Sequence, residues 1–194
     1  MEWRGDAPGP SVVVTANIHG DETTGIGVVH HLDRWLAERD LPGCVVLVPS
    51  CNPLGLEAGS RAVAGEDVDL NRLFPGNPRG GYGARLASAL WRDVCARRPD
   101  LVIDLHADAP RSIPYVIMDR PVRHVGGGRR ELSGRIERLA EATGLTRLWE
   151  YPDEQYVQVG LDRSLAGAVV NLLGVPALTR SEEHTSELQS PCNL

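Results

Sequence analysis

Residues 11–22, SVVVTANIHGDE, decide the fold class, because a β-branched apolar run is followed within a few residues by a helical pattern. The run Ser11–Ala16 is rich in Val and predicts a buried strand. Apolar residues then recur at helical spacing over residues 22–39, which predicts a helix. A buried strand that leads directly into a helix is the repeating unit of α/β proteins.

The same alternation continues along the chain. Further strands are predicted at residues 44–49, 100–105, Tyr115–Met118 and from 175 to 179, and further helices at 84–98, Arg129–Ala142 and 161–173. Residues 50–83 are rich in Gly, Pro and Asn, and a loop of that length inside a compact domain is usually functional. The pattern predicts an α/β fold, a three-layer sandwich in which helices cover both faces of a mainly parallel mixed sheet.

The composition limits the classes of function. The 194 residues suffice for one domain with a hydrophobic core, and the formal net charge of -6 argues against a nucleic-acid partner. No apolar run is long enough to span a membrane, and the first residues lack the apolar core of a signal peptide. The cysteines show no CxxC spacing, so we expect a reduced, cytoplasmic protein without a cysteine zinc site. All basic residues are Arg, which is typical of a GC-rich, bacterial genome; the oligomeric state stays open.

The last residues are of a different kind. Residues 180–190, RSEEHTSELQS, are the in-frame translation of a common sequencing adapter. We therefore expect one domain over residues 1–179 and an artefactual tail over residues 180–194 that packs poorly. The alternative is a native polar C-terminus.

His19 and Glu22 lie where the first predicted strand passes into the first predicted helix. This spacing offers one imidazole and one carboxylate to a single Zn²⁺. The alternative is that His19 is an ordinary loop residue and that Glu22 is a charge favoured at a helix N-terminus.

His106 follows the predicted strand at residues 100–105 and supplies a third candidate ligand. Ligands in open α/β sheets gather at the carboxyl ends of strands, so His106 and His19 would meet at one rim if their strands are parallel neighbours. Two imidazoles and one carboxylate leave a fourth position for water, which is the catalytic arrangement of zinc. Asp104 points to the same face of the strand as His106, and it either orients an imidazole or serves as a strand-end hydrogen-bonding residue.

Asn71 and Arg72 lie in the long loop, within DLNRLFPG. An amide beside a planar guanidinium is suited to binding a carboxylate. The alternative is a solvated arginine.

Three motifs resemble the zinc carboxypeptidase superfamily: His19-x-x-Glu22, Asn71-Arg72 and His106 within DLHAD. More narrowly, IHGDE and NPLGLEAGSR followed by DLNRLFPG are similar to the succinylglutamate desuccinylase/aspartoacylase branch, over residues 8–179. The resemblance implies the zinc carboxypeptidase-like fold, also called phosphorylase/hydrolase-like.

The resemblance also implies roles for individual residues. His19, Glu22 and His106 would hold one Zn²⁺, and Asn71 and Arg72 would hold the carboxylate of a small-molecule substrate. Arg61 would polarise the scissile carbonyl and stabilise its oxyanion, as a catalytic residue.

The general base of the family is a Glu in a segment like PALTxE. This chain reads Pro176-Ala-Leu-Thr179 and then Arg180-Ser181, so the expected Glu falls at Ser181. By this comparison the chain lacks its base and the C-terminal portion of the family, and its N-terminus is short of the first strands.

The sequence thus predicts a zinc-dependent hydrolase that cleaves an amide bond and deacylates an N-acyl amino acid or a similar small carboxylate. One alternative is a carboxypeptidase or peptidoglycan peptidase of the same superfamily, which an upstream signal peptide would favour. Another is a zinc-binding domain without turnover, which describes the chain better if the base is missing.

Overall fold

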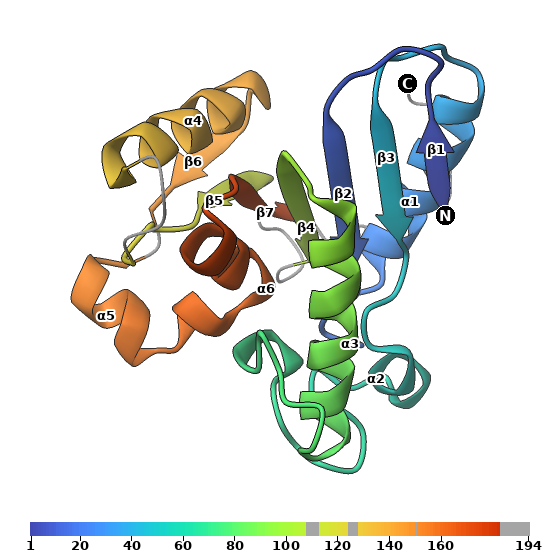
Figure 1. Cartoon of the computed structure of the whole chain (residues 1–194). Helices are drawn as coiled ribbons and strands as arrows, with labels where there is room; N and C mark the ends of the chain where they lie inside the picture. Colours follow the sequence, from blue (N-terminus) through green and yellow to red (C-terminus); the bar gives the residue numbers. More distant parts are fainter. Residues whose placement is uncertain (108–112, 124–127, 150, 183–194) are drawn as a thin grey trace.

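The computed structural model describes residues 1–107, 113–123, 128–149 and 151–182. Its centre is a seven-stranded sheet in the order β1-β3-β2-β4-β7-β5-β6 (Figure 1). The strands are β1 (Glu2–Arg4), β2 (Ser11–Ala16), β3 (Cys44–Val48), β4 (Leu101–Ala107), β5 (Tyr115–Met118), β6 (Thr146–Leu148) and β7 (Ala177–Glu182).

Parallel pairing dominates the sheet. β2 lies between β3 and β4 and is parallel to both, and β4 is also parallel to β7. β1 and β5 run antiparallel to β3 and β7, whereas β5 and β6 are parallel. The predicted mainly parallel mixed sheet is confirmed, and because β2 and β4 are parallel neighbours, their carboxyl ends reach the same rim.

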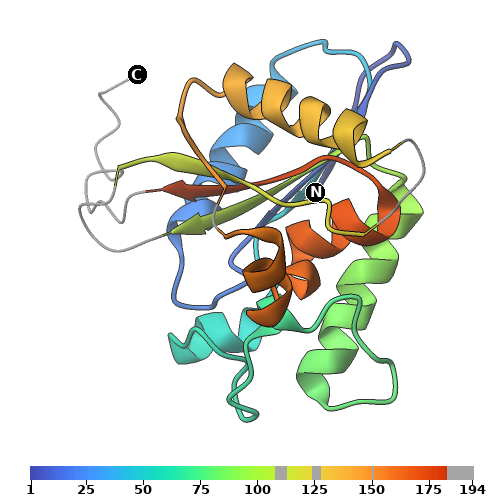
Figure 2. The ribbon, with the colours of Figure 1, turned by 90° about the vertical axis from the view of Figure 1, so that its left-hand side faces the viewer.

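Helices cover both faces of the sheet (Figures 1 and 2). The helical elements are α1 (Thr24–Ala37), α2 (Pro53–Ala58), η1 (Leu70–Arg72), α3 (Tyr82–Arg97), α4 (Arg129–Ala142), α5 (Asp153–Gln158), η2 (Leu161–Arg163), α6 (Leu165–Ala168) and the π-helical η3 (Val169–Leu173). α1 and α4 cover one face, and α3 and α6 cover the other, as the edge-on view in Figure 2 shows. This is the predicted three-layer sandwich.

Successive side chains of the central strands point to opposite faces of the sheet. Val14, Ala16 and Leu105 pack with α1, whereas their neighbours Val13 and Val102 belong to a second, larger cluster of buried residues. The continuous apolar runs seen in the sequence follow from this, because a parallel strand is buried on both sides.

Several boundaries differ from the sequence predictions. α1 begins at Thr24, so Glu22 lies two residues before the helix and not within it. The single helix predicted at residues 161–173 is three short elements, because Ser164 is extended and its side chain caps a new start at Leu165, and the helix becomes π-helical from Val169 onward. In the described part of the chain, no helix is long and apolar enough to cross a membrane.

β7 extends past Thr179. The strand runs to Glu182, and Ser181 is buried and pairs with His106 of β4. The expectation of poor packing from residue 180 onward is therefore wrong for Ser181, and residues 183–194 lie outside the described residues. The assignment of the tail to an adapter stays a prediction.

Candidate metal centre and substrate cavity

His19 and Glu22 are held by the turn between β2 and α1. Asn17 adopts the left-handed conformation with a φ of 55°, which Asn tolerates better than most residues. Its side-chain amide donates hydrogen bonds of 3.0–3.1 Å to the carbonyl oxygens of His19, Gly20 and Glu22. A Cβ at Gly20 would lie 2.0 Å from the backbone of Gly55, so this turn also packs directly on α2. These contacts hold the backbone of both candidate ligands in place without a metal.

His106 lies on β4, near the carboxyl end of the strand. Asp104 lies on the same face and is fully buried. Its Oδ2 is 2.9 Å from His106 Nε2, and its Oδ1 accepts a hydrogen bond of 2.7 Å from the hydroxyl of Thr15 on β2. Asp104 thus orients the imidazole, as one of the two sequence interpretations expected.

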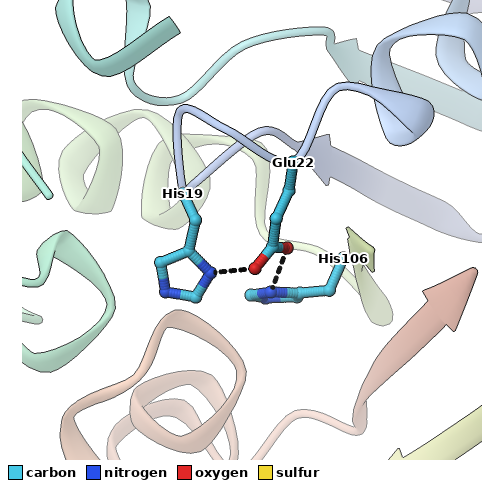
Figure 3. Close-up of side chains that lie close together, drawn as sticks. All are labelled: His19, Glu22 and His106. Carbon is cyan, nitrogen blue, oxygen red and sulfur yellow. Dashed lines mark hydrogen bonds and ion pairs between the residues drawn. The ribbon is translucent and has the colours of Figure 1, made fainter. Parts of the chain in front are cut away.

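The three candidate ligands converge, as Figure 3 shows. Glu22 lies between the imidazoles, with Oε1 2.7 Å from His19 Nδ1 and Oε2 2.9 Å from His106 Nδ1. One donor atom from each residue lies within 4.8 Å of the others, close enough to share one ion. His106 is therefore on the same rim as His19, as predicted.

The donor set fits a divalent transition metal such as Zn²⁺. Both Nδ1 atoms face the shared point, while both Nε2 atoms are hydrogen-bonded to carboxylates: His106 to Asp104, and His19 to Asp69 Oδ1 at 3.2 Å. Metal-ligating histidines almost always have such a partner on the second ring nitrogen, because it fixes the ring and raises its basicity. Asp69 was not singled out from the sequence, although it precedes Asn71 by two residues.

The charges of the site stabilise one another. Burial alone would lower the pKa of His106, but Asp104 and Glu22 outweigh it and raise that pKa to about 10. Burial likewise opposes ionisation of Glu22, but the hydrogen bonds with His106 and His19 hold its pKa well below the usual range. For Asp69, the hydrogen bond with His19 outweighs burial and lowers the pKa to about 2. In the metal-free protein the site is a network of ion pairs.

Arg61 reaches this network from the loop after α2. Its Nη1 donates a hydrogen bond of 3.1 Å to Glu22 Oε1, and its Nη2 lies 3.6 Å from Asp69 Oδ2. About half of the Arg61 side chain stays exposed (54%), so the guanidinium is accessible to a ligand above the metal site.

Asn71 and Arg72 lie in η1, on the wall of the same cavity. The Asn71 side-chain oxygen accepts a hydrogen bond from the backbone N–H of Leu165, which leaves its amide group as the part that can donate to a ligand. Arg72 donates from Nε to the carbonyl of Val159 and from Nη1 to the carbonyl of Asn71. These bonds hold the guanidinium in place beside the cavity.

The cavity has a volume of about 330 Å³ and joins all six residues predicted from the sequence. Its lining residues are His19, Glu22, Arg61, Asn71, Arg72, His106, Ala107, Tyr115, Ile117, Asp119, Leu161, Ser164, Thr179 and Ser181. Asp119 was missed in the sequence because nothing in its neighbourhood resembles a motif. Ser181 occupies the position expected for the general base, and among the described residues its buried hydroxyl has no hydrogen-bond partner.

Several curated relatives match part of the chain. The N-alpha-acetyl-L-2,4-diaminobutyric acid deacetylase of Halomonas elongata is 36% identical over 99 residues, which are 51% of this chain and 29% of that protein. The succinylglutamate desuccinylase of Burkholderia pseudomallei is 44% identical over 80 residues, which are 41% of this chain and 21% of that protein. The chain thus spans less than a third of the length of either relative.

Among solved structures, an aspartoacylase family protein from Mesorhizobium loti superimposes with a TM-score of 0.75 at 26% identity, covering 93% of this chain and 53% of that one. The sequence model of the succinylglutamate desuccinylase/aspartoacylase catalytic domain matches residues 8–124, a stretch that includes all three candidate metal ligands. The chain belongs to the succinylglutamate desuccinylase/aspartoacylase family.

Proposed function

We propose that the protein is a zinc-dependent hydrolase that removes the acyl group from an N-acyl amino acid. The observation that carries this proposal is the single cavity in which His19, Glu22 and His106 converge beside Arg61 and Arg72. The relatives named above are a deacetylase and a desuccinylase of amino acids, which supports the same reaction class.

The metal would be held by His19, Glu22 and His106. When bound, Zn²⁺ acts as a Lewis acid on the scissile carbonyl and lowers the pKa of water towards neutrality. Asp104 and Asp69 hold the two imidazoles in the orientation that presents Nδ1 to the ion.

Arg61 and the Asn71–Arg72 pair would bind different parts of the substrate. The Arg61 guanidinium lies against Glu22, so it can donate to a carbonyl oxygen at the metal and stabilise the negative charge that develops there. The Asn71 amide and the Arg72 guanidinium bind the carboxylate of the amino acid and hold the amide bond in register.

A second candidate function, a metal-binding domain without turnover, is favoured by Ser181. Amide hydrolysis needs a group that takes a proton from water and returns it to the leaving amine, and the serine hydroxyl is no base at neutral pH. Ser181 lies opposite His106, where a carboxylate would face the cavity. We infer that the chain with Ser181 binds metal and substrate but turns substrate over slowly.

Two measurements on the purified chain test the proposal. Metal analysis after dialysis should find one zinc per chain, and Ser181→Glu should hydrolyse N-acetyl or N-succinyl amino acids in a product assay that detects the free amine. A chain that holds no zinc, or a zinc-loaded Ser181→Glu variant that hydrolyses none of these amides, would overturn the proposed reaction.

A further inference from the structure

The loop that carries Arg61 is hydrogen-bonded to helix α3 through Glu66. After Arg61 the chain forms a short hairpin, in which the backbone N–H of Val63 donates a hydrogen bond of 2.9 Å to the carbonyl of Val68. Val63 is buried in the larger cluster, and Glu66 lies in the turn between the two bridged residues. Glu66 is exposed, and the proposed mechanism does not use it.

The Glu66 carboxylate caps α3 from outside the helix. Its Oε2 accepts a hydrogen bond of 2.9 Å from the backbone N–H of Gly83, and its Oε1 accepts one from the backbone N–H of Tyr82. α3 begins at Tyr82, and Gly81 at the cap position has no side chain that could bond to these groups. The first N–H groups of a helix have no partner within the helix and favour a negative charge, so a carboxylate from another segment satisfies them.

The start of α3 leaves room for this carboxylate. A Cβ at Gly81 would lie 2.5 Å from Glu66 Oε1, and one at Gly83 would lie 3.2 Å from Oε2. A side chain at Gly81 would therefore displace the carboxylate. The two hydrogen bonds hold the pKa of Glu66 below its usual value, so the group stays ionised at neutral pH and the contact with α3 persists.

Arg61 depends on this hairpin for its position. Its side chain is 54% exposed, and its guanidinium contacts Glu22 and Asp69 in the metal site. The backbone beside it is held by a long hydrogen bond of 3.4 Å from Asn52 to the carbonyl of Ala62, and by the hairpin that Glu66 anchors. A change at Glu66 should therefore reach the guanidinium.

Asn71 and Arg72, which follow the hairpin, are held by other contacts. The Asn71 side-chain oxygen accepts a hydrogen bond of 2.8 Å from the N–H of Leu165, and Arg72 Nε donates one of 3.1 Å to the carbonyl of Val159. Neither bond passes through Glu66. The same change should thus leave the carboxylate site intact.

We propose that Glu66 is a positioning residue for Arg61: by capping α3 it holds the hairpin, and with it the guanidinium, beside the metal site. The proposal rests on the deacylase function proposed above, because Arg61 acts there on the carbonyl of the substrate amide. Glu66 itself touches no substrate.

Titration calorimetry with the zinc-loaded chain tests this assignment without requiring turnover. N-acetyl-L-alanine offers both a carbonyl and a carboxylate, whereas L-alanine lacks the acyl carbonyl. We expect Arg61→Ala to weaken the binding of N-acetyl-L-alanine by about tenfold or more, since a charge-assisted hydrogen bond is lost. Glu66→Ala should weaken it by about threefold to tenfold, because the guanidinium is displaced and not removed. Neither change should alter the affinity for L-alanine.

The double variant Arg61→Ala/Glu66→Ala separates positioning from a general effect on the fold. If Glu66 acts through Arg61, adding Glu66→Ala to Arg61→Ala should change the affinity no further. Glu66→Gln, which keeps one acceptor oxygen, should restore part of the affinity lost in Glu66→Ala. The control is Glu57→Ala, the same change at an exposed carboxylate of α2, which should bind like the unaltered chain.

Gly81→Ala is an independent variant that keeps Glu66 but displaces its carboxylate, and it replaces Glu66→Ala if that chain does not fold. It should produce the same loss. Unchanged affinity for N-acetyl-L-alanine in both variants, an equal loss for L-alanine, or a further loss on top of Arg61→Ala would overturn the assignment. No binding of N-acetyl-L-alanine to the unaltered chain would overturn it as well.

The proposed reaction can fail separately. In an active Ser181→Glu chain, Glu66→Ala should lower kcat more than it raises KM, because the contact with Arg61 strengthens as charge develops on the oxygen. A Ser181→Glu chain that hydrolyses no amide, but still binds N-acetyl-L-alanine through Arg61 and Glu66, would overturn the deacylase function and keep the role of Glu66. An active chain with the same kcat with and without Glu66 would do the reverse.

Discussion

His106 and Ser181 lie directly opposite each other in the parallel pairing of β4 and β7. Both side chains line the cavity, so residue 181 faces the metal site from the neighbouring strand. This register gives a direct way to add the missing proton acceptor.

Ser181→Glu should raise the rate of amide hydrolysis by about 10²–10⁴-fold, the usual contribution of a general base. The reason is that a carboxylate at this position reaches the space beside His106. Initial rates with an N-acyl amino acid would be compared with those of Ser181→Gln, which has the same shape but no basic group. Equal rates for the Glu and Gln variants would contradict the role assigned to residue 181.

His106→Ala should abolish stoichiometric zinc binding, because one donor atom is lost together with one of the two contacts that hold Glu22 Oε2, the other being the backbone N–H of Ala107. His30, which is exposed on α1, is the matched control, and His30→Ala should retain one zinc per chain. Metal content after dialysis is the measurement. Retention of a full equivalent of zinc by His106→Ala would rule out this ligand set.

Asp104→Asn should weaken zinc binding by about tenfold to a hundredfold, the usual effect of changing the carboxylate behind a metal-bound histidine. The substitution keeps the shape but removes the charge that Asp104 places 2.9 Å from His106 Nε2. Competition with a chelator would measure the affinity, with the exposed Asp93→Asn on α3 as control. An unchanged affinity would mean that Asp104 only supports the strand through Thr15.

Zinc binding should become stronger as the pH rises from 6 to 9. A metal binds neutral imidazole, and the raised pKa of His106, about 10, means that this ring carries a proton throughout that range in the metal-free protein. Each proton displaced changes the affinity by about tenfold per pH unit while the pH is below the pKa. Because the pKa of Glu22 is lowered, its carboxylate adds no proton release in this range.

Calorimetry in buffers of different ionisation enthalpy would count the protons released on zinc binding. At pH 7 we expect at least one proton per zinc. An affinity that is flat between pH 6 and 9 would show that the two histidines are already neutral in the metal-free protein.

Arg72→Ala should weaken the binding of amino acids through their carboxylate by about tenfold or more while leaving zinc in place, since a charge-assisted hydrogen bond is lost. The comparison is with Arg79→Ala, an exposed arginine of the same loop. Calorimetry with an amino acid and with its amide would separate the carboxylate contact from other effects. Equal losses for the acid and the amide would contradict this contact.

Much of the fold follows from local patterns. The β-branched apolar run Ser11–Ala16 and the helical pattern of Arg129–Ala142 both predicted elements with the observed bounds. β1 and β6 have three residues each, too few for a periodic pattern to emerge. The breaks within residues 161–173 depend on the extended, capping Ser164 and on the change to π-helical hydrogen bonding at Val169, neither of which interrupts the apolar pattern of the sequence.

The site could be predicted as far as its motifs extend. His19, Glu22 and His106 stood out because strand ends and a helix start bring imidazoles and a carboxylate to one rim, and the structure brings them together. Asp119 could not be found this way, because it reaches the cavity only through the antiparallel placement of β5 beside β7. Pairing between distant segments is set by tertiary packing and leaves no mark on local sequence.

The Glu22 carboxylate links the two imidazoles without a metal, and Asp104 and Asp69 hold their outer nitrogens. In small zinc domains the ion itself brings the ligands together, and the chain unfolds when the ion is removed. In this chain the hydrogen bonds and the packed sheet already bring the three ligands together, so the metal site is preorganised. A chelator should therefore take the metal without melting the protein, and ions of similar size should exchange in place on a scaffold that does not move.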